Sequence, residues 1–381
     1  MVIKEIIKLS ISRLEESINT EEKIFCNRFI IDKNNNLIRI GKSLRYSIFS
    51  LIGLYKAYTF GYKTIINIDE IVKTIYDSNQ LDIIDNSHFL WLLGLIHEKK
   101  LIEKRIERVH KIENEIFKYG NVDIAWVLTS LCSIYPIANN QKDLYNLIQI
   151  LKKRLVFDFD QNGELFCKNR HNASNKIVQR INNTIGSFAN QVYSIYALSK
   201  YLSLFKDSEV KDIIQRCAKN ICELQGDLGQ WWWIYNTQKG CIAEKYPVYA
   251  VHQDGMAPMA LIEVAEVTNT DYSQYILKGL GWFNNNELDK ELINYEKNFI
   301  YRSILRKKGI INPRFLGIGY GGLNISGRLN IANSALLGSS ANGQIINQNK
   351  LEIDLETRPY HYGWILNAFV GNENIISENQ C

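Results

Sequence analysis

Apolar residues recur every three or four positions along most of the chain, which is the period of an amphipathic helix. In residues 44–58, for example, Leu44, Ile48 and Leu51 share one helix face. Comparable patterns predict further helices in residues 65–75, 89–96, 124–134, 144–155, 188–204, 210–224, 257–267, 276–283 and 360–369. Short links rich in Asn, Asp and Gly separate these stretches, which is typical of stacked helical hairpins.

The hairpins show no strict repeat. The segments SLRYSIFSLIGLYKAYTFGYK and GSFANQVYSIYALSKYLSLFKD share an aromatic and aliphatic rhythm, but no fixed consensus runs through the chain. Because an open solenoid needs regular repeats, this pattern favours a closed ring in which each hairpin has its own shape. We therefore expect an all-α protein, a full or incomplete α/α toroid, in one domain that spans residues 1–381.

One long segment breaks the helical pattern. Residues 312–349, NPRFLGIGYGGLNISGRLNIANSALLGSSANGQIIN, are rich in Gly, Asn and Ser but keep apolar side chains such as Phe315 and Ile331. A break of this length in a compact domain is usually functional or disordered, and the apolar content argues against disorder. We expect a non-helical, partly extended insertion that packs across one mouth of the toroid.

Composition narrows the classes of partner. The 45 Lys and Arg residues are interspersed with 40 Asp and Glu residues, for a net charge of +5, so we expect no nucleic-acid partner. No apolar run is long enough to span a bilayer, and Lys4, Glu5 and Lys8 interrupt any signal-peptide core, so we expect a cytoplasmic protein without stable membrane insertion. The 7 cysteines have no CxxC spacing and are expected as free thiols, with no metal site.

The segment QGDLGQWWW contains a QxxxGxW pattern formed by Gln225, Gly229 and Trp231. The pattern resembles the QW motif of the α/α-toroid superfamily that includes squalene and hopene cyclases and protein prenyltransferase β subunits. The resemblance implies that Gln225 ties the start of the following helix. The acidic DxDD motif of the cyclases is absent, since residues 158–161 read DFDQ, and the prenyltransferase zinc ligands have no counterpart.

A second resemblance covers the residues that follow. GQWWW, YPVY, DGMAPMAL and VTN are similar to segments of the six-hairpin carbohydrate enzymes, above all the unsaturated glucuronyl and rhamnogalacturonyl hydrolases. The resemblance implies that Asp254 is a general acid/base. His252 and Gln253, which precede it, have no match in that pattern.

The residues around Asp254 support a catalytic site without any family. Asp254 precedes the predicted helix 257–267, so it is either a helix N-cap or a catalytic carboxyl at a helix mouth. If the lead-in is extended, His252 points to the same side of the chain and tunes or assists Asp254. A structural histidine is the alternative for His252. Glu244 is the best second carboxylate for glycoside chemistry, and a solvated loop glutamate is its alternative.

Aromatic side chains near Asp254 suit a sugar. Trp231, Trp232 and Trp233 are consecutive, and a helix would spread them around its circumference, so at least one is expected to face a cavity. Flat aromatic faces suit sugar rings and also carbocations. The alternative is that all three pack in the core. Tyr246 and Tyr249 follow in the same segment, and both are candidate substrate contacts.

The last predicted helix opens with a second polar and aromatic cluster, ETRPYHYGW. In a closed ring the first and last hairpins meet, so Arg358 and His361 would converge on the same mouth as Asn190, at the start of another helix. Arg358 would then bind a carboxylate of a ligand as a bidentate fork. The alternative is a buried salt bridge that closes the ring, for example to Glu356.

Three functions are compatible with these features. The first is a carbohydrate-active enzyme of hydrolase, lyase or epimerase type that uses Asp254 with His252 or Glu244 on a small saccharide and needs no cofactor. The second is an isoprenoid-processing enzyme related to terpene cyclases or prenyltransferases. The third is a non-catalytic toroid that binds a partner as a scaffold.

Overall fold

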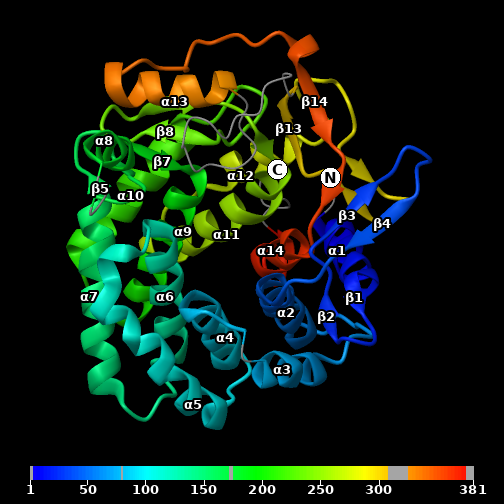
Figure 1. The fold of residues 1–381 in the computed structure, drawn as a ribbon, viewed down its shortest axis with the longest axis vertical. Helices are drawn as coiled ribbons and strands as arrows, with labels where there is room; N and C mark the ends of the chain where they lie inside the picture. The colour runs from blue at the N-terminus through cyan, green and yellow to red at the C-terminus, as the bar shows by residue number, and fades with distance from the viewer. Residues whose placement is uncertain (1–2, 79, 171–174, 308–324, 375–381) are drawn as a thin grey trace.

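The computed structural model describes residues 3–78, 80–170, 175–307 and 325–374. Helices dominate it, and each stretch with helical period in the sequence overlaps a helix (Figure 1). None of the helices in these ranges is long and apolar enough to cross a membrane. The same ranges contain no group of three or more His, Cys, Asp or Glu side chains that could hold a metal ion.

An inner ring of parallel helices forms the body of the molecule (Figure 1). Its members are α2 (Leu44–Thr59), α4 (Ile83–Leu95), α6 (Asn121–Ile134), α9 (Phe188–Leu204), α11 (Ala257–Thr268) and α14 (Pro359–Phe369). Each contacts the next, and α14 returns to α2, so the ring is closed. Tyr46 meets Tyr360 where α2 and α14 begin, and Lys56 meets Asn367 where they end, so these two helices run in the same direction.

A second layer of helices covers the ring from outside. It consists of α1 (Ile3–Ser17), α3 (Ile68–Asp77), α5 (Lys99–His110), α7 (Gln141–Asp158), α10 (Ser208–Glu223) and α12 (Ser273–Gly281). Each packs on one inner helix, and α1 packs on α14, so the first and last helices of the chain complete the ring. This is the closed α/α toroid that the periodicity predicted.

Helices α2 and α14 approach closely where the ring closes. A Cβ added at Gly363 would lie 2.4 Å from the backbone oxygen of Phe49, and one at Gly53 would lie 2.2 Å from the oxygen of Gly363. Only glycine allows two helix backbones to come this near. The closure therefore depends on a matched pair of glycines far apart in the sequence.

Short antiparallel strands connect the helices. Three sheets have three strands each: β7 (Ile185–Ser187), β8 (Ile234–Asn236) and β9 (Cys241–Glu244); β10 (Val248–Tyr249), β13 (Ser303–Arg306) and β14 (Leu351–Asp354); and β15 (Glu356–Thr357), β3 (Arg28–Ile31) and β4 (Leu37–Ile40). Three pairs complete the set: β1 (Ile18–Asn19) with β2 (Ile24–Phe25), β5 (Phe159–Asp160) with β6 (Leu165–Phe166), and β11 (Ile293–Asn294) with β12 (Phe299–Ile300). Strands β7, β10 and β15 lead directly into inner helices, so they lie at the end of the barrel where those helices begin, the amino-terminal mouth.

The expectation of a non-helical segment at 312–349 is wrong in part. Residues 312–324 lie outside the described residues, but Ile325–Leu337 form helix α13. Ile331 and Ala335 of α13 are buried in a small cluster with Ile185 and Ile234 from β7 and β8. Burial of this face outweighs the low helix propensity of the Asn, Ser and Gly residues that suggested a loop. Helix α8 (Lys176–Thr184) lies beside α13.

Aromatic side chains fill the middle of the barrel. This aromatic plug comprises Phe49, His88, Trp91, Trp126, Tyr193 and Trp364, which contact one another edge to face or tilted at centroid distances of 4.3–6.2 Å. Trp364 is fully buried at its centre. The plug divides the barrel axis into the amino-terminal mouth and a carboxyl-terminal mouth, where the inner helices end.

Candidate functional site

Asp254 lies in a single π-helical turn at the amino-terminal mouth. The chain becomes helical at Ala250, passes through the π turn His252–Met256 and continues as α11. Asp254 is thus inside a helix, and the sequence expectations of an N-cap and of an extended lead-in are wrong. A π turn inserts an extra residue into a helix and is often found at functional sites.

The Asp254 carboxyl is paired with His361. Its Oδ1 lies 2.6 Å from Nε2 of His361, in the first turn of α14, and both side chains are buried. The other oxygen, Oδ2, has no hydrogen-bond partner among the described residues. Burial raises the pKa of the Asp254 carboxyl above its usual range, although His361 acts in the opposite direction. The closed ring therefore joins two residues that are 107 positions apart.

His252 faces a different set of neighbours. Its ring stacks on Trp233 at 5.5 Å, and it contacts Phe188 at 4.7 Å and Tyr249 at 5.1 Å. Burial lowers the pKa of His252 to about 3, and the charges of His361 and Arg302 act in the same direction. His252 is therefore neutral at ordinary pH, and its Nδ1 has no hydrogen-bond partner among the described residues.

The three consecutive tryptophans lie in an irregular segment before β8, and not on the helix that was considered for them. Their side chains therefore have three different environments. Trp231 is fully buried against Phe188, and Trp232 is buried beside Tyr246. Trp233 is only partly buried. Of the three, Trp233 is the one whose ring stacks on that of His252.

Three arginines surround one glutamate at this mouth. Glu356 accepts hydrogen bonds from Arg28 at 2.8 Å, from Arg358 at 2.7 Å and from Arg302. Arg358 also donates to the Tyr46 hydroxyl at 2.7 Å, and the Arg302 guanidinium lies 5.3 Å from the Tyr249 ring centroid. Burial alone would raise the pKa of Glu356, but Arg302 and Arg358 hold it below its usual range.

The ion pair between Arg358 and Glu356 is the alternative that the sequence analysis gave for Arg358. This ion pair does not bury all of the positive charge in the cluster. The side chains of Arg302 and Arg358 remain 24% and 22% exposed, whereas that of Glu356 is 7% exposed. The guanidinium groups therefore present positive charge to the mouth while the carboxylate lies beneath them.

Glu244 lies in a separate cluster. It is fully buried, its Oε1 accepts from Arg306 at 2.8 Å and from the Tyr246 backbone N–H at 3.0 Å, and its Oε2 accepts from Asn330 at 2.6 Å. These bonds occupy both oxygens, so the geometry describes an ion pair that joins β9 to β13 and α13.

Two other candidates also have structural partners. The Tyr246 hydroxyl donates to Glu287 at 2.7 Å, in a cluster that includes Trp282. Asn190 forms a capping box with Ser187 at the start of α9 and donates to Asn121 at 3.3 Å. Both side chains are buried, and neither contacts the Asp254–His361 pair in the described part of the chain.

Gln225 binds the backbone at the start of a helix, although this helix is α12 and not α11, the next helix in the chain. Its Nε2 donates to the Gly229 oxygen at 3.1 Å and to the Tyr275 oxygen at 2.9 Å. Tyr275 lies near the start of α12, so this amide links the turn after α10 to the beginning of the next outer helix.

No local pattern in the sequence points to Arg302, Arg28 or Tyr46 as residues of this site. Arg302 comes from the turn between β12 and β13, and Arg28 comes from β3, which pairs with β15. Each is an isolated residue in an ordinary sequence context. Only the pairing of strands from the two ends of the chain brings them to Glu356.

The fold is similar to that of several carbohydrate-active enzymes. A glycosyl hydrolase of family 88 from Bacteroides vulgatus is 11% identical, with 98% of this chain and 100% of that chain covered and a TM-score of 0.57. A sugar epimerase from a ruminal bacterium is 9% identical, with 97% and 99% covered and a TM-score of 0.59. A possible member of family GH105 from Klebsiella pneumoniae is 9% identical, with 99% and 93% covered and a TM-score of 0.58.

These similarities confirm the α/α-toroid fold that the sequence predicted. They extend over the whole chain, but the sequence identity is too low to transfer an activity. No known protein-family model matches the chain, and no curated protein sequence matches it.

Proposed function

We propose that this protein is a carbohydrate-active enzyme that uses Asp254 and His361 as an acid/base pair at the amino-terminal mouth. The observation that carries the proposal is the unpartnered Oδ2 of Asp254. This atom is buried, while the other oxygen of the same carboxyl is bound to His361. A buried polar atom without a partner is costly and needs an explanation. The missing partner is explained if Oδ2 accepts a proton from a substrate or donates one to it.

The acid/base role also agrees with the electrostatics. A useful general acid needs a pKa closer to neutral pH than that of a free aspartate. Burial raises the pKa of the Asp254 carboxyl. The ring of His361, 2.6 Å from Oδ1, holds this carboxyl in one orientation and leaves Oδ2 for a substrate.

The ligand that suits this mouth is a saccharide with a carboxylate group. Trp233, which is only partly buried, offers aromatic surface beside His252 and the buried Tyr249, and aromatic faces stack well on sugar rings. Arg302 and Arg358 lie where inner helices begin, and helix amino termini carry positive partial charge. Three guanidinium groups face the carboxylates of Glu356 and Asp354, so one positive charge remains in excess. Such an excess in a positive field favours an anion, which an acidic sugar supplies and a prenyl chain lacks.

The site favours proton transfer over displacement by two carboxylates. A typical glycosidase uses two free carboxyl groups. Here Glu244 is occupied by Arg306 and Asn330, and Glu356 is occupied by arginines. Asp254 and His361 alone would support proton abstraction or donation next to a carboxylate, as in elimination or epimerisation.

The test is an assay of the purified full chain against oligosaccharides with and without uronic acids. New reducing ends would indicate hydrolysis, an ultraviolet-absorbing unsaturated product would indicate elimination, and a changed sugar configuration would indicate epimerisation. On the substrate found, Asp254→Asn should lower kcat by at least ~100-fold, the usual contribution of a general acid or base.

The matched control is Asp123→Asn, which alters a carboxyl in the first turn of α6 whose partner is the Gly120 backbone N–H. Its turnover should stay close to that of the unmodified protein. Thermal melts separate catalysis from folding for both variants. A folded Asp254→Asn protein with unchanged turnover would remove the acid/base role, and no turnover on any saccharide would favour the scaffold alternative.

A further inference from the structure

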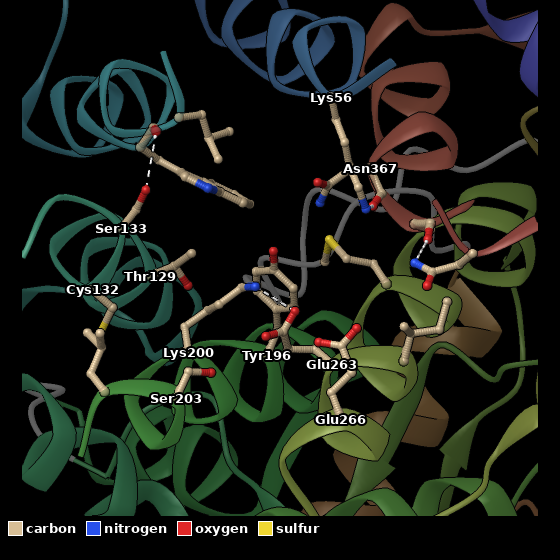
Figure 2. Close-up of a pocket in the computed structure, with 17 residues that line it drawn as sticks. Lys56, Thr129, Cys132, Ser133, Tyr196, Lys200, Ser203, Glu263, Glu266 and Asn367 are labelled. Carbon is tan, nitrogen blue, oxygen red and sulfur yellow. Dashed lines mark hydrogen bonds and ion pairs between the residues drawn. The ribbon is translucent and has the colours of Figure 1, made fainter. Parts of the chain in front are cut away.

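A separate cavity opens at the carboxyl-terminal mouth, below the aromatic plug (Figure 2). It has a volume of about 360 Å³, which is within the range of small-ligand sites. Its apolar wall includes Leu95, Leu204, Ile262 and Ala368, and its polar groups come from five of the inner helices. None of the residues considered above for the acid/base site lines this cavity.

Two lysines and two glutamates surround this space. Lys200 and Glu263 form an ion pair at 2.5 Å between α9 and α11. Although Lys200 lies deep between the helices, 33% of its side-chain surface is exposed, because it faces the cavity. Figure 2 shows the Lys200 and Tyr196 side chains side by side, and the ammonium group lies 5.2 Å from the ring centroid.

Lys56 and Glu266 are one charge of each sign that has no direct ion pair in the described part of the chain, and in this sense they are the unmatched charges of the cavity. The Lys56 ammonium donates to the backbone oxygen of Asn367 at 2.6 Å and has no carboxylate within ion-pair distance in the described part of the chain. An ammonium group has three donors, so two remain available. Glu266 is exposed and has no hydrogen bond or ion pair among the described residues.

Burial, and to a smaller extent the charge of Lys200, lowers the pKa of Lys56, while the charges of Glu263, Glu266 and Glu373 act in the opposite direction from beyond ion-pair distance. Inner helices end at this mouth, and helix carboxyl termini carry negative partial charge. This field stabilises lysines in general, but it does not supply a discrete anion. The cavity thus offers one inner cation, one outer anion and an apolar wall between the helices.

We propose that this cavity binds a small zwitterion with an apolar side chain, which is the chemistry of a free α-amino acid. The ligand carboxylate would accept from Lys56, its ammonium group would face Glu266, and its side chain would pack against Trp91 and Ile262. A zwitterion satisfies both unmatched charges and leaves the net charge of the cavity unchanged. A ligand with only one charged group leaves the other protein charge without a partner.

Titration calorimetry with the full chain and L-phenylalanine tests this site. Binding to the unmodified protein is expected. Phenethylamine lacks the carboxylate and phenylpropanoate lacks the ammonium group, so each should bind at least tenfold more weakly. Lys56→Met and Glu266→Gln should each weaken L-phenylalanine binding by about tenfold, equivalent to about 1.4 kcal/mol.

Lys219→Met, on the exposed side of α10, is the matched control and should bind like the unmodified protein. Since Glu266 is exposed and makes no hydrogen bond in the described structure, Glu266→Gln tests the site even if Lys56→Met does not fold. Asp254→Asn should retain binding, so failure of the acid/base proposal does not affect this one. No binding of L-phenylalanine, equal binding of phenylpropanoate, or normal binding by both cavity variants would overturn the proposal.

Discussion

The two mouths of the barrel differ in how their charged groups are paired and buried. At the amino-terminal mouth, Arg302 and Arg358 converge on Glu356, and the Asp254 carboxyl lies buried with one oxygen unpartnered. At the carboxyl-terminal mouth, the charged groups line an open cavity, and among the described residues Lys56 has only a backbone oxygen as its hydrogen-bond partner.

The direction of the inner helices explains part of this difference. Helix amino termini attract anions and carboxyl termini attract cations, so lysines at the carboxyl-terminal mouth agree with the helix field. Arginines at the amino-terminal mouth oppose it. Arginines that oppose the local field are stronger evidence for a bound anion than lysines that follow it. The amino-terminal mouth therefore favours an acidic ligand more strongly than the carboxyl-terminal mouth favours an anion.

The largest effect is expected from a break in the aromatic plug that separates the mouths. Trp364→Ala should lower the free energy of unfolding by about 3–5 kcal/mol, since it removes a fully buried indole from the centre of the barrel. Urea unfolding measures this loss. Added indole should fill the new cavity and raise the melting temperature of the variant but not of the unmodified protein.

Trp282→Ala is the control, because Trp282 is equally buried but lies outside the plug. It should be destabilised to a similar degree. If Trp364→Ala costs less than about 1 kcal/mol, well below the usual range for such a truncation, the plug does not separate the two mouths.

The next largest effect is a loss of stability at acidic pH. Burial lowers the pKa of His88, in the plug, to about 4, whereas an unfolded histidine titrates near 6.5. A depressed folded-state pKa gives stability that is complete above pH ~6.5 and is lost as the pH falls through about 4. The loss should be on the order of 3 kcal/mol, measured by unfolding across this range.

His88→Phe should reduce this acid sensitivity, since phenylalanine keeps an aromatic ring against Phe49 and Trp126 without a titrating group. His97 is the matched control because it lies outside the core, so His97→Phe should leave the pH profile unchanged. Equal pH profiles for His88→Phe and the unmodified protein would contradict the assignment of the acid loss to His88.

The smallest expected effect sharpens the ligand preference of the amino-terminal mouth. Arg358→Met should raise KM for an acidic saccharide by about tenfold and change kcat little, since it removes a binding charge but not the proton-transfer pair. Arg28→Met removes a guanidinium that also binds Glu356 from β3, and its effect should be smaller. Equal changes in the two variants would mean that the arginines act only through Glu356.

Much of the fold was predictable because helical periodicity is a local signal. Residues 188–204 form α9 with the predicted limits, and residues 44–58 correspond to α2. Helix α13 was missed because its Gly, Asn and Ser content conceals the buried face formed by Ile331 and Ala335. Tertiary contacts with β7 and β8 decide that segment.

The candidate site was predictable only in part. Asp254 and His361 were each identified from their local sequence, and closure of the ring was expected to make them possible partners. The direct contact itself could not be predicted, since nothing in one segment specifies contact with another segment 107 residues away. His252 was assigned to Asp254 on the assumption of an extended lead-in, and the π turn directs it to Trp233 instead. The extra residue of the π turn shifts the helical phase by one residue, and this shift decides which side chains contact each other.

The sequence by itself determined the helices, their order and the chemical groups available, because amphipathic period and residue type are properties of short segments. The tertiary structure decided which groups meet. Closure of the ring joins α14 to α2 and α11, and the tertiary packing brings Arg28, on the strand paired with β15, and Arg302 to Glu356. It also decided that the barrel has two mouths of different character, because packing around the axis, and not any local motif, places the plug between them.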